Sequence, residues 1–323
     1  MSVKEQVLQA LEENKGESLS GENLAEKMQV SRAAIHKAIK SLREDGYRIE
    51  AVTNRGYCLA KDSDLLSAQG IRVHLHPEFK DLPLHVYQTI DSTNNAAKKL
   101  ALDGSPHPAA VLALHQSRGK GRLGRTFISP ANTGIYMSVL LKPPLDMSLA
   151  VLVTTAASVA VCRAMEKICA AEPSIKWVND IYANGKKVCG ILTEAITDFE
   201  TGQIQSLILG IGINCSAKAL PEELQQIAGA LEGDFSKNQL AAQILNELLP
   251  LMEDPGSRTF LPDYRKRSMV LGKKIQVYKG GYTEDTPGHP ATVLGIDENG
   301  GLQVLYSDGS RETLSTGEIS IRL

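Results

Sequence analysis

The pattern of apolar and polar positions in the first sixty residues predicts three short amphipathic helices followed by a hairpin. Apolar residues share one helical face in residues 3–11 and 24–28, and again in residues 35–42 at the i, i+3, i+4, i+7 spacing of an α-helix. Ser31 precedes the third helix as an N-cap, and Gly46 ends it. Two short strands, residues 47–52 and 57–59, then flank a turn at residues 53–56. This order of elements predicts a winged helix-turn-helix.

The polar face of the third predicted helix is basic. Residues 31–57 contain six Lys or Arg and three Asp or Glu, whereas residues 1–30 contain three and six. A small basic face on an acidic scaffold suits one recognition helix in a DNA groove, with the turn on the backbone. The alternative is a winged-helix module that binds protein. The residues predicted to contact DNA are Ser31, Arg32, His36, Lys37, Lys40 and Arg55.

From residue 71 onward the pattern alternates between strands and helices. Apolar runs predict strands at residues 84–87, 109–114, 135–141, 174–177, 188–195 and 206–213, and helices at 95–102, 149–171, 221–231 and 237–252. Neighbouring strands joined by short turns favour an antiparallel or mixed sheet with the helices on one face. From residue 269, short strands with tight glycine turns predict a small SH3-like barrel. We therefore expect an α+β protein of three domains, residues 1–64, 65–268 and 269–323.

Composition narrows the classes of function. The 323 residues carry a formal net charge of −2, so any binding to nucleic acid or a membrane must be local. The N-terminal stretch lacks the apolar core of a signal peptide, and the longest apolar run is too short to span a bilayer. Five cysteines without C-x-x-C spacing indicate reduced thiols, not a metal site or disulfides. These features predict a cytoplasmic protein with no membrane partner.

Basic residues and glycines are concentrated in residues 115–125, directly after a predicted strand. This stretch contains four Lys or Arg and three glycines. Glycine permits tight turns and close approach of a ligand, and cations spaced along such a loop suit phosphate or carboxylate. The stretch is not a Walker A loop, and its G-x-G-x-x-G spacing at residues 119–124 does not open a predicted helix. We interpret it as an anion-binding loop; the alternative is a solvated basic loop or a nucleic-acid contact.

Five short strings occur in this order: D-S-T-N (91–94), G-K-G-R-L-G-R (119–125), K-W-V-N-D (176–180), K-V-C-G-I-L (187–192) and G-I-G-I-N (210–214). The set resembles the biotin protein ligases. With a winged helix before it and a small barrel after it, the whole chain resembles the bacterial proteins that combine a biotin ligase with a biotin operon repressor. The resemblance implies that the central domain is a mixed-sheet catalytic domain of the biotin/lipoate ligase type.

The resemblance also implies an activity and its partners. Such an enzyme forms biotinoyl-5'-AMP from biotin and ATP with Mg²⁺, then passes biotin to a lysine of biotin carboxyl carrier protein or another acceptor domain. The adenylate-bound protein would form a homodimer on operator DNA and repress biotin biosynthesis genes. The runner-up is a lipoate–protein ligase, against which the winged helix and the Lys187 string argue. A ligand-sensing transcription regulator without catalysis is an alternative from another class, and pyrophosphate release with biotin and ATP would exclude it.

The resemblance also implies roles for single residues. Those implied to hold the ureido ring of biotin are Ser92, Thr93, Asn94 and Gln116. Those implied to cover its tail and the adenylate phosphate are Lys120, Gly121 and Arg122, while Lys187 would bridge carboxylate and phosphate. Lys187 and Arg122 would be the catalytic residues. Asn179 and Asp180 would orient ATP and Mg²⁺, with Asp180 as the metal ligand, and Arg125, Asn214 and Arg322 would complete the site.

Simpler interpretations of some of these residues stay open. Residues 92–94 resemble an ordinary helix N-cap, and Lys187 could be a surface turn lysine beside Lys186. The chain also departs from the family pattern in the glycine loop. Lys120 stands where Arg is usual, which keeps the charge without the bidentate geometry. Leu123 replaces a cation, which puts a phosphate role at that position in doubt.

Overall fold

The structure is a computed structural model that describes residues 1–52, 55–142, 150–198, 200, 203–217, 220–279 and 287–315, and the backbone of residues 319–322. The chain divides into two compact units. One contains Met1–Lys80 with Ser236–Gln243, and the other contains Asp81–Phe235 with Ile244–Leu323.

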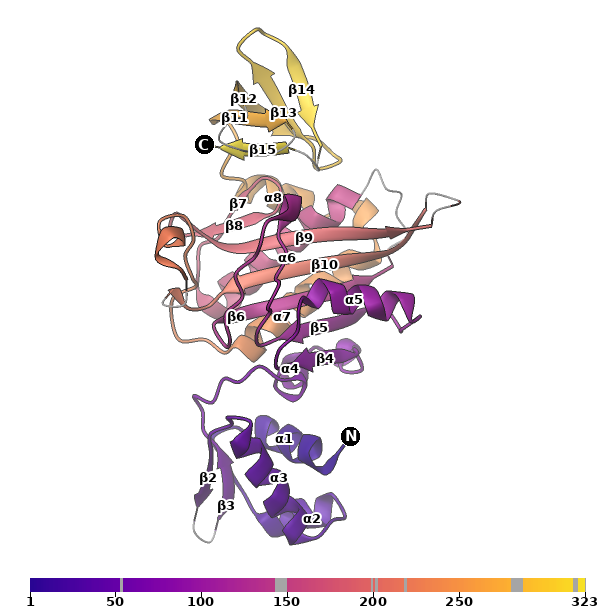
Figure 1. The fold of residues 1–323 in the computed structure, drawn as a ribbon, viewed down its shortest axis with the longest axis vertical. Helices are drawn as coiled ribbons and strands as arrows, with labels where there is room; N and C mark the ends of the chain where they lie inside the picture. The colour runs from indigo at the N-terminus through magenta and orange to yellow at the C-terminus, as the bar shows by residue number, and fades with distance from the viewer. Residues whose placement is uncertain are drawn as a thin grey trace. The chain divides into compact units, whose positions relative to one another are not determined.

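The first unit begins with the predicted winged helix-turn-helix (Figure 1). Helices α1 (Val3–Glu13), α2 (Gly21–Lys27) and α3 (Arg32–Glu44) bury their apolar faces against one another. Strands β2 (Ile49–Val52) and β3 (Gly56–Leu59) form the wing, and β1 (Ser18–Leu19) pairs with β3. Ser31 caps α3 as predicted, because its hydroxyl accepts a hydrogen bond from Ala34 N at 3.2 Å. Residues 53 and 54 of the predicted turn lie outside the described residues.

A polar joint at residues 61–64 and two unpredicted elements follow the winged helix in this unit. Helix α4 (Ala68–His74) and the 3₁₀ turn η1 (Pro77–Phe79) follow the joint. Asp64 Oδ1 accepts hydrogen bonds from Lys237 N at 2.9 Å and Ser236 Oγ at 3.0 Å, so it caps the start of α7 (Lys237–Glu253). Residues 65–80 and 236–243 belong to the same compact unit as the winged helix. The domain boundary expected after residue 64 stays a prediction.

A seven-stranded mixed sheet forms the centre of the second unit. Its strand order is β4-β5-β6-β10-β9-β8-β7, and only β4 and β5 run parallel. The strands are β4 (Leu84–Tyr87), β5 (Ala109–Ala113), β6 (Gly134–Leu141), β7 (Ser174–Lys176), β8 (Asp180–Ala183), β9 (Lys186–Thr197) and β10 (Ile204–Asn214). The long strand β10 lies between β6 and β9 and pairs with both along most of its length.

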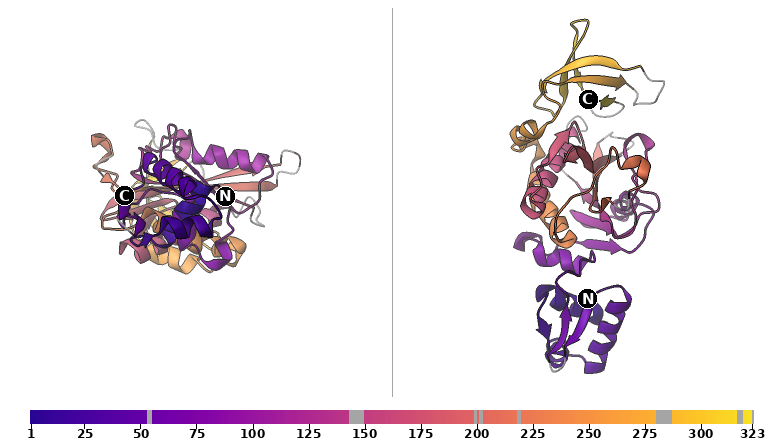
Figure 2. Two further views of the ribbon diagram at one scale, coloured as in Figure 1. Left: turned by 90° about the horizontal axis from the view of Figure 1, so that it is seen from below. Right: turned by 90° about the vertical axis from the view of Figure 1, so that its left-hand side faces the viewer.

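Helices cover both faces of this sheet, so the expectation that they lie on one face is wrong (Figure 1, Figure 2). Helix α5 (Thr93–Leu102) packs through Ala97 on Val111, Leu140 and Ile208. Helix α6 (Ala150–Cys169) lies on the opposite face, where Thr154 Oγ1 is 2.7 Å from Thr193 Oγ1. The continuous apolar run of β10 carried this information, because a strand buried on both faces does not alternate with polar residues.

The C-terminal part is a five-stranded antiparallel sheet, as the short strands and glycine turns predicted. Its order is β14-β13-β12-β11-β15, with β15 (Ile319–Arg322) not predicted. The other strands are β11 (Lys274–Lys279), β12 (His289–Ile296), β13 (Leu302–Tyr306) and β14 (Arg311–Leu314). Trp177 Nε1 donates to Gly300 O at 2.9 Å, and Arg265 Nε of α8 (Leu261–Arg267) donates to Ile296 O at 2.9 Å. Within the described ranges, none of the helices has the length and hydropathy to cross a bilayer.

Asp64→Ala should lower the free energy of unfolding of the first unit by about 1–2 kcal/mol, because Lys237 N at the start of α7 loses its acceptor and the Lys237 ammonium loses its ion-pair partner. The matched control is Asp62→Ala, which removes an exposed carboxylate paired with Arg48 and should cost less than about 0.5 kcal/mol. Urea unfolding followed by circular dichroism measures both. Equal losses in the two variants would contradict the capping role.

Candidate active site

A cavity of about 710 Å³ opens on the face of the central sheet that carries α5. That volume suits a small organic ligand. The lining includes all but one of the residues predicted to bind ligand: Ser92, Thr93, Asn94, Gln116, Lys120, Gly121, Arg122, Arg125, Asn179, Asp180, Lys187 and Asn214. The exception is Arg322, whose backbone lies in β15 and whose side chain is outside the described residues. The structure therefore brings five distant strings together, and the roles of their residues stay predictions.

Glycines on the central strands make room for the side chains above them. A Cβ atom at Gly210 would lie 2.4 Å from Asn94 Oδ1, and one at Gly212 would lie 2.6 Å from the ring of Phe127. Both distances are too short for any side chain. Phe127 also contacts Tyr136 edge-on, with ring centroids 6.3 Å apart. The glycines of the string at 210–214 thus let α5 and the glycine loop approach the floor of the cavity closely.

One part of the cavity is a network of neutral hydrogen-bonding groups. Gln116 Oε1 accepts from Thr93 N at 2.8 Å and from Thr93 Oγ1 at 3.1 Å, and Gln116 Nε2 donates to Ser129 Oγ at 2.8 Å. Ser138 Oγ lies 2.7 Å from Thr93 Oγ1 and 2.5 Å from Asn94 Oδ1. Such a network fixes the direction of each donor and acceptor before a ligand arrives.

The start of α5 differs from the sequence prediction. The helix begins at Thr93, two residues earlier than expected, and the Ser92 side chain makes no capping hydrogen bond although Ser92 is the N-cap residue. The simple capping interpretation is therefore wrong for Ser92. Ser92, Thr93 and Asn94 are all buried and line the cavity. The side chains of Thr93 and Asn94 take part in the polar network.

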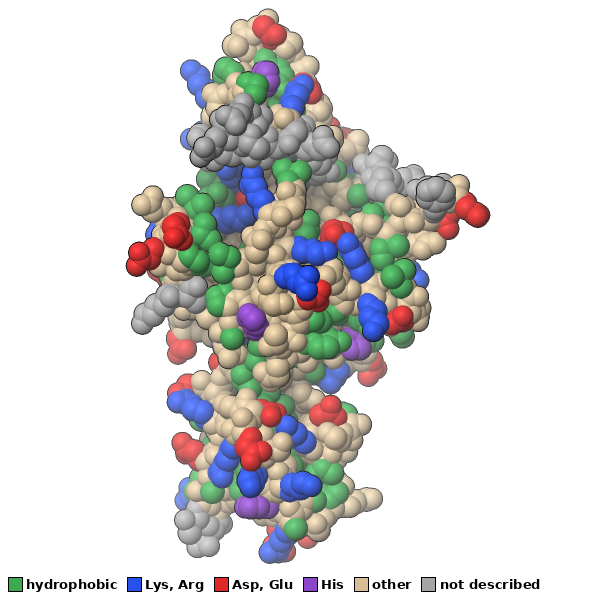
Figure 3. Space-filling view, in the orientation of Figure 1, with side chains coloured by type: hydrophobic (Ala, Val, Ile, Leu, Met, Phe, Trp, Pro, Cys, Tyr) green, Lys and Arg blue, Asp and Glu red, His purple; other side chains and the backbone are tan. Residues whose placement is uncertain are grey.

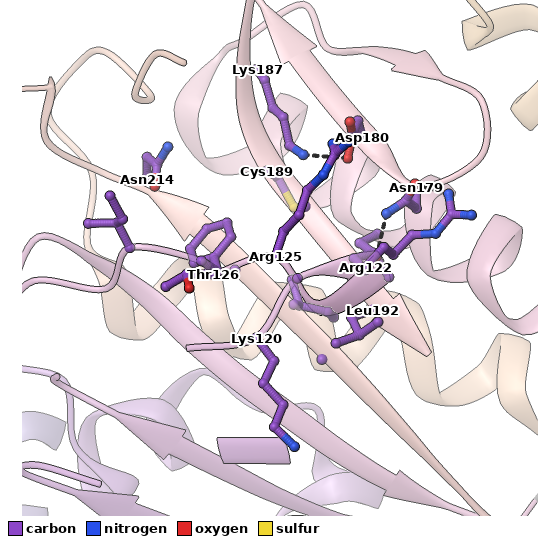
Figure 4. Close-up of a pocket in the computed structure, with 18 of the residues that line it drawn as sticks. Lys120, Arg122, Arg125, Thr126, Asn179, Asp180, Lys187, Cys189, Leu192 and Asn214 are labelled. Atoms are coloured by element: carbon purple, nitrogen blue, oxygen red, sulfur yellow. Dashed lines mark hydrogen bonds and ion pairs between the residues drawn. The ribbon is translucent and has the colours of Figure 1, made fainter. Parts of the chain in front are cut away.

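The glycine loop, residues 119–125, lies over the cavity and is closed by backbone hydrogen bonds (Figure 4). Phe127 N donates to Gly119 O at 2.9 Å, and Gly121 N donates to Arg125 O at 2.7 Å. A Cβ atom at Gly119 would lie 2.3 Å from Phe127 O, so this position requires glycine. Leu123 adopts a left-handed conformation (φ 56°) with 45% of its surface exposed, and offers no charge to a ligand. The loop's cations Lys120, Arg122 and Arg125 all line the cavity.

A second part of the cavity is cationic. Arg122 Nη1 donates to Asn179 Oδ1 at 3.0 Å, and Asn179 Nδ2 donates to Ile191 O at 2.7 Å, which ties the guanidinium to the sheet. Burial lowers the pKa of Arg122, an effect that nearby Asp180 opposes. Lys187 Nζ lies 2.6 Å from Asp180 Oδ1. Among the described lining residues, five Lys or Arg face a single carboxylate, so the site is suited to an anion.

A shift in strand pairing directs Lys187 into the cavity. Cys189 of β9 pairs with Ile181 of β8, but the next pair is Lys187 with Tyr182, so Val188 is an extra residue on β9. An extra residue reverses the alternation of faces. Lys187 therefore shares the cavity face with Gly190, although strict alternation would place it on the other face. The alternative that Lys187 is a solvated turn lysine does not fit this contact with Asp180, at 35% side-chain exposure.

The helix predicted at residues 221–231 is wrong. Only the 3₁₀ turn η5 (Glu222–Leu224) forms, and the chain then pairs with β9 at Lys187: Lys187 N donates to Ile227 O at 3.2 Å and Gly229 N donates to Lys187 O at 2.9 Å. Asn214 Nδ2 donates to Gly229 O at 3.0 Å, so this predicted ligand residue also holds the wall. Backbone bonding to β9 replaces the helical bonds. Leu220, Leu224 and Ile227 thereby supply an apolar wall that sequence reasoning missed.

The residues predicted to contact DNA lie in the first unit. His36, Lys37 and Lys40 are exposed on α3, opposite its buried residues, and Arg55 is exposed in the wing. Arg32 forms an ion pair with Glu22. Arg32 and Arg55 both line a shallow hollow between α2, α3 and the wing. Figure 3 shows Lys, Arg and His side chains, with Asp and Glu side chains among them, on the visible face of this unit.

Comparison with known proteins identifies this arrangement. A model of the Biotin/lipoate A/B protein ligase family matches residues 86–214, which include the sheet and the glycine loop. The Bifunctional ligase/repressor BirA of Bacillus spizizenii is 34% identical over 254 residues, covering 78% of each chain. The chain belongs to the family of bifunctional biotin protein ligases and repressors.

Other biotin protein ligases agree with this membership along nearly the whole chain. An HTH domain model matches residues 3–58, and a Biotin protein ligase C terminal domain model matches residues 286–322. BirA of Escherichia coli is 30% identical over 317 residues, covering 95% of this chain and 94% of its own. The biotin protein ligase from Aquifex aeolicus in complex with biotin and ATP superposes with a TM-score of 0.62 at 26% identity, covering 74% of this chain and 98% of that one.

Gly210→Ala should lower the free energy of unfolding of this ligase by about 1–3 kcal/mol, because the new methyl group overpacks against the buried Asn94 amide. Gly190→Ala on the neighbouring strand is the control: its Cβ would meet atoms at 3.4 Å or more, so the change should stay within about 0.5 kcal/mol. Thermal unfolding of both variants checks this. A stable Gly210→Ala protein would show that Asn94 is free to move.

Proposed function

We propose that this protein activates biotin with ATP and attaches it to an acceptor protein. The biotin carboxylate attacks the α-phosphorus of ATP and forms biotinoyl-5'-AMP with release of pyrophosphate. The ε-amine of a lysine on biotin carboxyl carrier protein then attacks the acyl carbon and AMP leaves. The observation that carries this proposal is the single cavity that joins a neutral polar network, at Thr93 and Gln116, to a cationic part at Arg122 and Lys187.

The cationic part supports the adenylation step. Carboxylate and triphosphate are both anionic, and charge at the phosphorus increases as they react, so fixed positive groups lower the barrier. Arg122 is held in place by Asn179, and Lys187 by Asp180. In our proposal Lys187 bridges the two reacting groups and Arg122 contacts the phosphate. The neutral network holds the ureido ring of biotin, and the apolar wall at Leu220 and Ile227 excludes water from the adenylate.

Magnesium fits this site in one way. No cluster of three or more His, Cys, Asp or Glu able to hold a metal occurs within the part of the chain that the structure describes. Mg²⁺ does not need one, because it takes one or two carboxylates with substrate phosphates and water. In our proposal Asp180, the one acidic side chain in the described lining, holds Mg²⁺ beside the nucleotide. There the ion would neutralise charge on the phosphates.

Lys187→Ala should slow pyrophosphate release by about a hundredfold to a thousandfold, the loss seen when a charge-stabilising donor is removed from an enclosed site. Radiolabelled pyrophosphate released on mixing protein, biotin and ATP measures this. The control is Lys186→Ala, which removes the neighbouring exposed lysine, whose Nζ donates to Gln225 O on the wall. If both variants lose equal activity, the loss comes from a displaced wall and not from the charge. Lipoate in place of biotin tests the related ligase, and no pyrophosphate with either acid would leave a ligand sensor.

We also propose that the protein represses biotin biosynthesis genes as a homodimer on operator DNA, in the cytoplasm. Support comes from the winged helix with its exposed basic residues on α3, and from five cysteines without a disulfide among the described residues. A ligand that binds the dimer-competent state more tightly must promote dimerisation and hence DNA binding. Sedimentation with and without biotin and ATP would detect the dimer.

Lys40→Ala should weaken operator binding by about tenfold and flatten its salt dependence, because one phosphate contact is lost. Pyrophosphate release should stay at the level of the unchanged protein. The control is Lys99→Ala, which removes an exposed lysine from α5 in the other unit and should leave operator titrations unaltered. Normal DNA affinity in Lys40→Ala would contradict the placement of α3 in the groove.

A further inference from the structure

The carboxylate of Glu194 is hydrogen-bonded to the polar network. Glu194 belongs to none of the five sequence strings and does not line the cavity. Glu194 lies on β9, on the same face as Leu192 and Gly190. Its Oε2 accepts a hydrogen bond from Asn94 Nδ2 at 2.6 Å, and its Oε1 accepts one from Lys98 Nζ at 2.6 Å. Asn94 and Lys98 are four residues apart on α5 and therefore lie on the same side of the helix. One carboxylate thus holds two side chains of α5.

The first of these bonds decides which way the Asn94 amide points. An amide has a donor end and an acceptor end, and a carboxylate can only accept. With Nδ2 bonded to Glu194, the Asn94 oxygen must point away from it, and it lies over Gly210 and 2.5 Å from Ser138 Oγ. The flipped amide would place oxygen against carboxylate. Asn94 is 4% exposed, so water cannot compensate for that repulsion.

The second bond keeps the carboxylate charged. Burial would raise the pKa of Glu194, but hydrogen bonds from Lys98 and Asn94 hold it below its ordinary value. Lys98 and Glu194 are partly exposed, at 32% and 24% of their side chains, so Lys98 can also turn to solvent. The Asn94 amide has no such freedom. The carboxylate is therefore a permanent acceptor for Asn94 Nδ2 at neutral pH.

We propose that Glu194 is a positioning residue that locks the Asn94 amide with its oxygen toward the cavity, so that this part of the site accepts a hydrogen bond from a ligand N–H group. The cyclic urea of biotin carries such groups. This inference rests on the proposed function, since it names the polar group that the neutral network selects. Glu194 acts through Asn94 and does not contact the ligand itself.

Two substitutions of Glu194 separate the effect of the orientation of the Asn94 amide from the effect of the negative charge. Glu194→Gln removes the charge but keeps one amide oxygen for Asn94 Nδ2 while Lys98 turns to solvent, so KM for biotin should rise by less than about threefold. Glu194→Met has similar length and no acceptor, so the Asn94 amide can flip, and KM for biotin should rise by about tenfold or more. KM for ATP should change by less than about twofold in both. Equal effects of Gln and Met, or an equal rise in KM for ATP, would overturn the proposal.

An exchange of partners tests the same point by rescue. Asn94→Asp alone places two carboxylates together and should weaken biotin binding by about a hundredfold. Adding Glu194→Gln supplies an amide donor to that new carboxylate, whose second oxygen still faces the ligand, so binding should recover at least tenfold. Titration calorimetry with biotin measures each variant, and a double variant no better than Asn94→Asp would overturn the proposal.

Controls tie these results to Glu194. Glu172→Gln, an exposed glutamate of the same unit, and Lys99→Met, beside Lys98 on α5, should leave KM for biotin and ATP unchanged. Thermal unfolding checks that each variant is folded. If the unchanged protein releases no pyrophosphate with biotin and ATP, the proposed function fails. If it does, and Glu194→Met binds biotin normally, only this inference fails.

Discussion

The close approach of α5 and the glycine loop to strand β10 is the constraint on which this site depends. Strand β10 is paired on both sides, so its register is fixed by two neighbours and it cannot shift to relieve a clash. Gly210 and Gly212 let Asn94 and Phe127 lie directly on its surface. On the other face the same strand carries buried apolar side chains. One strand therefore serves as core on one face and as the floor of a cavity on the other.

Positive charge is distributed unevenly over the cavity above this floor. The backbone and the Asn179 amide anchor the cations at one part of the site, and the neutral groups bond chiefly to one another at the other part. Asp180 balances only part of the positive charge. A site built this way favours a ligand that is neutral and polar at one end and anionic at the other. Biotin and ATP, the two reactants of an adenylation, each have a neutral polar end and an anionic end.

Much of the fold could be predicted from the sequence, because local patterns of residues determine it. The winged helix, the strands of the central sheet and the C-terminal sheet followed from hydrophobic spacing and turn residues. Residues from all five strings line one cavity, and their roles in binding stay predictions. Three features could not be read. The wall at residues 220–228 has helical composition, but its backbone bonds to β9, a contact distant in sequence. Helices on both faces were not predicted, because short turns between strands are typical of sheets with one solvated face, whereas β10 is buried on both. Glu194 is not part of any string, and only the fold brings it to Asn94.

The extra residue Val188 on β9 has a consequence for how this family can vary. Upstream of it one set of alternate residues faces the cavity, and downstream of it the other set does. Insertion of one residue between Lys187 and Gly190 would turn the lysine toward the opposite side of the sheet while keeping every amino acid of the string. The length of this segment therefore matters to the direction of Lys187 as much as its composition does.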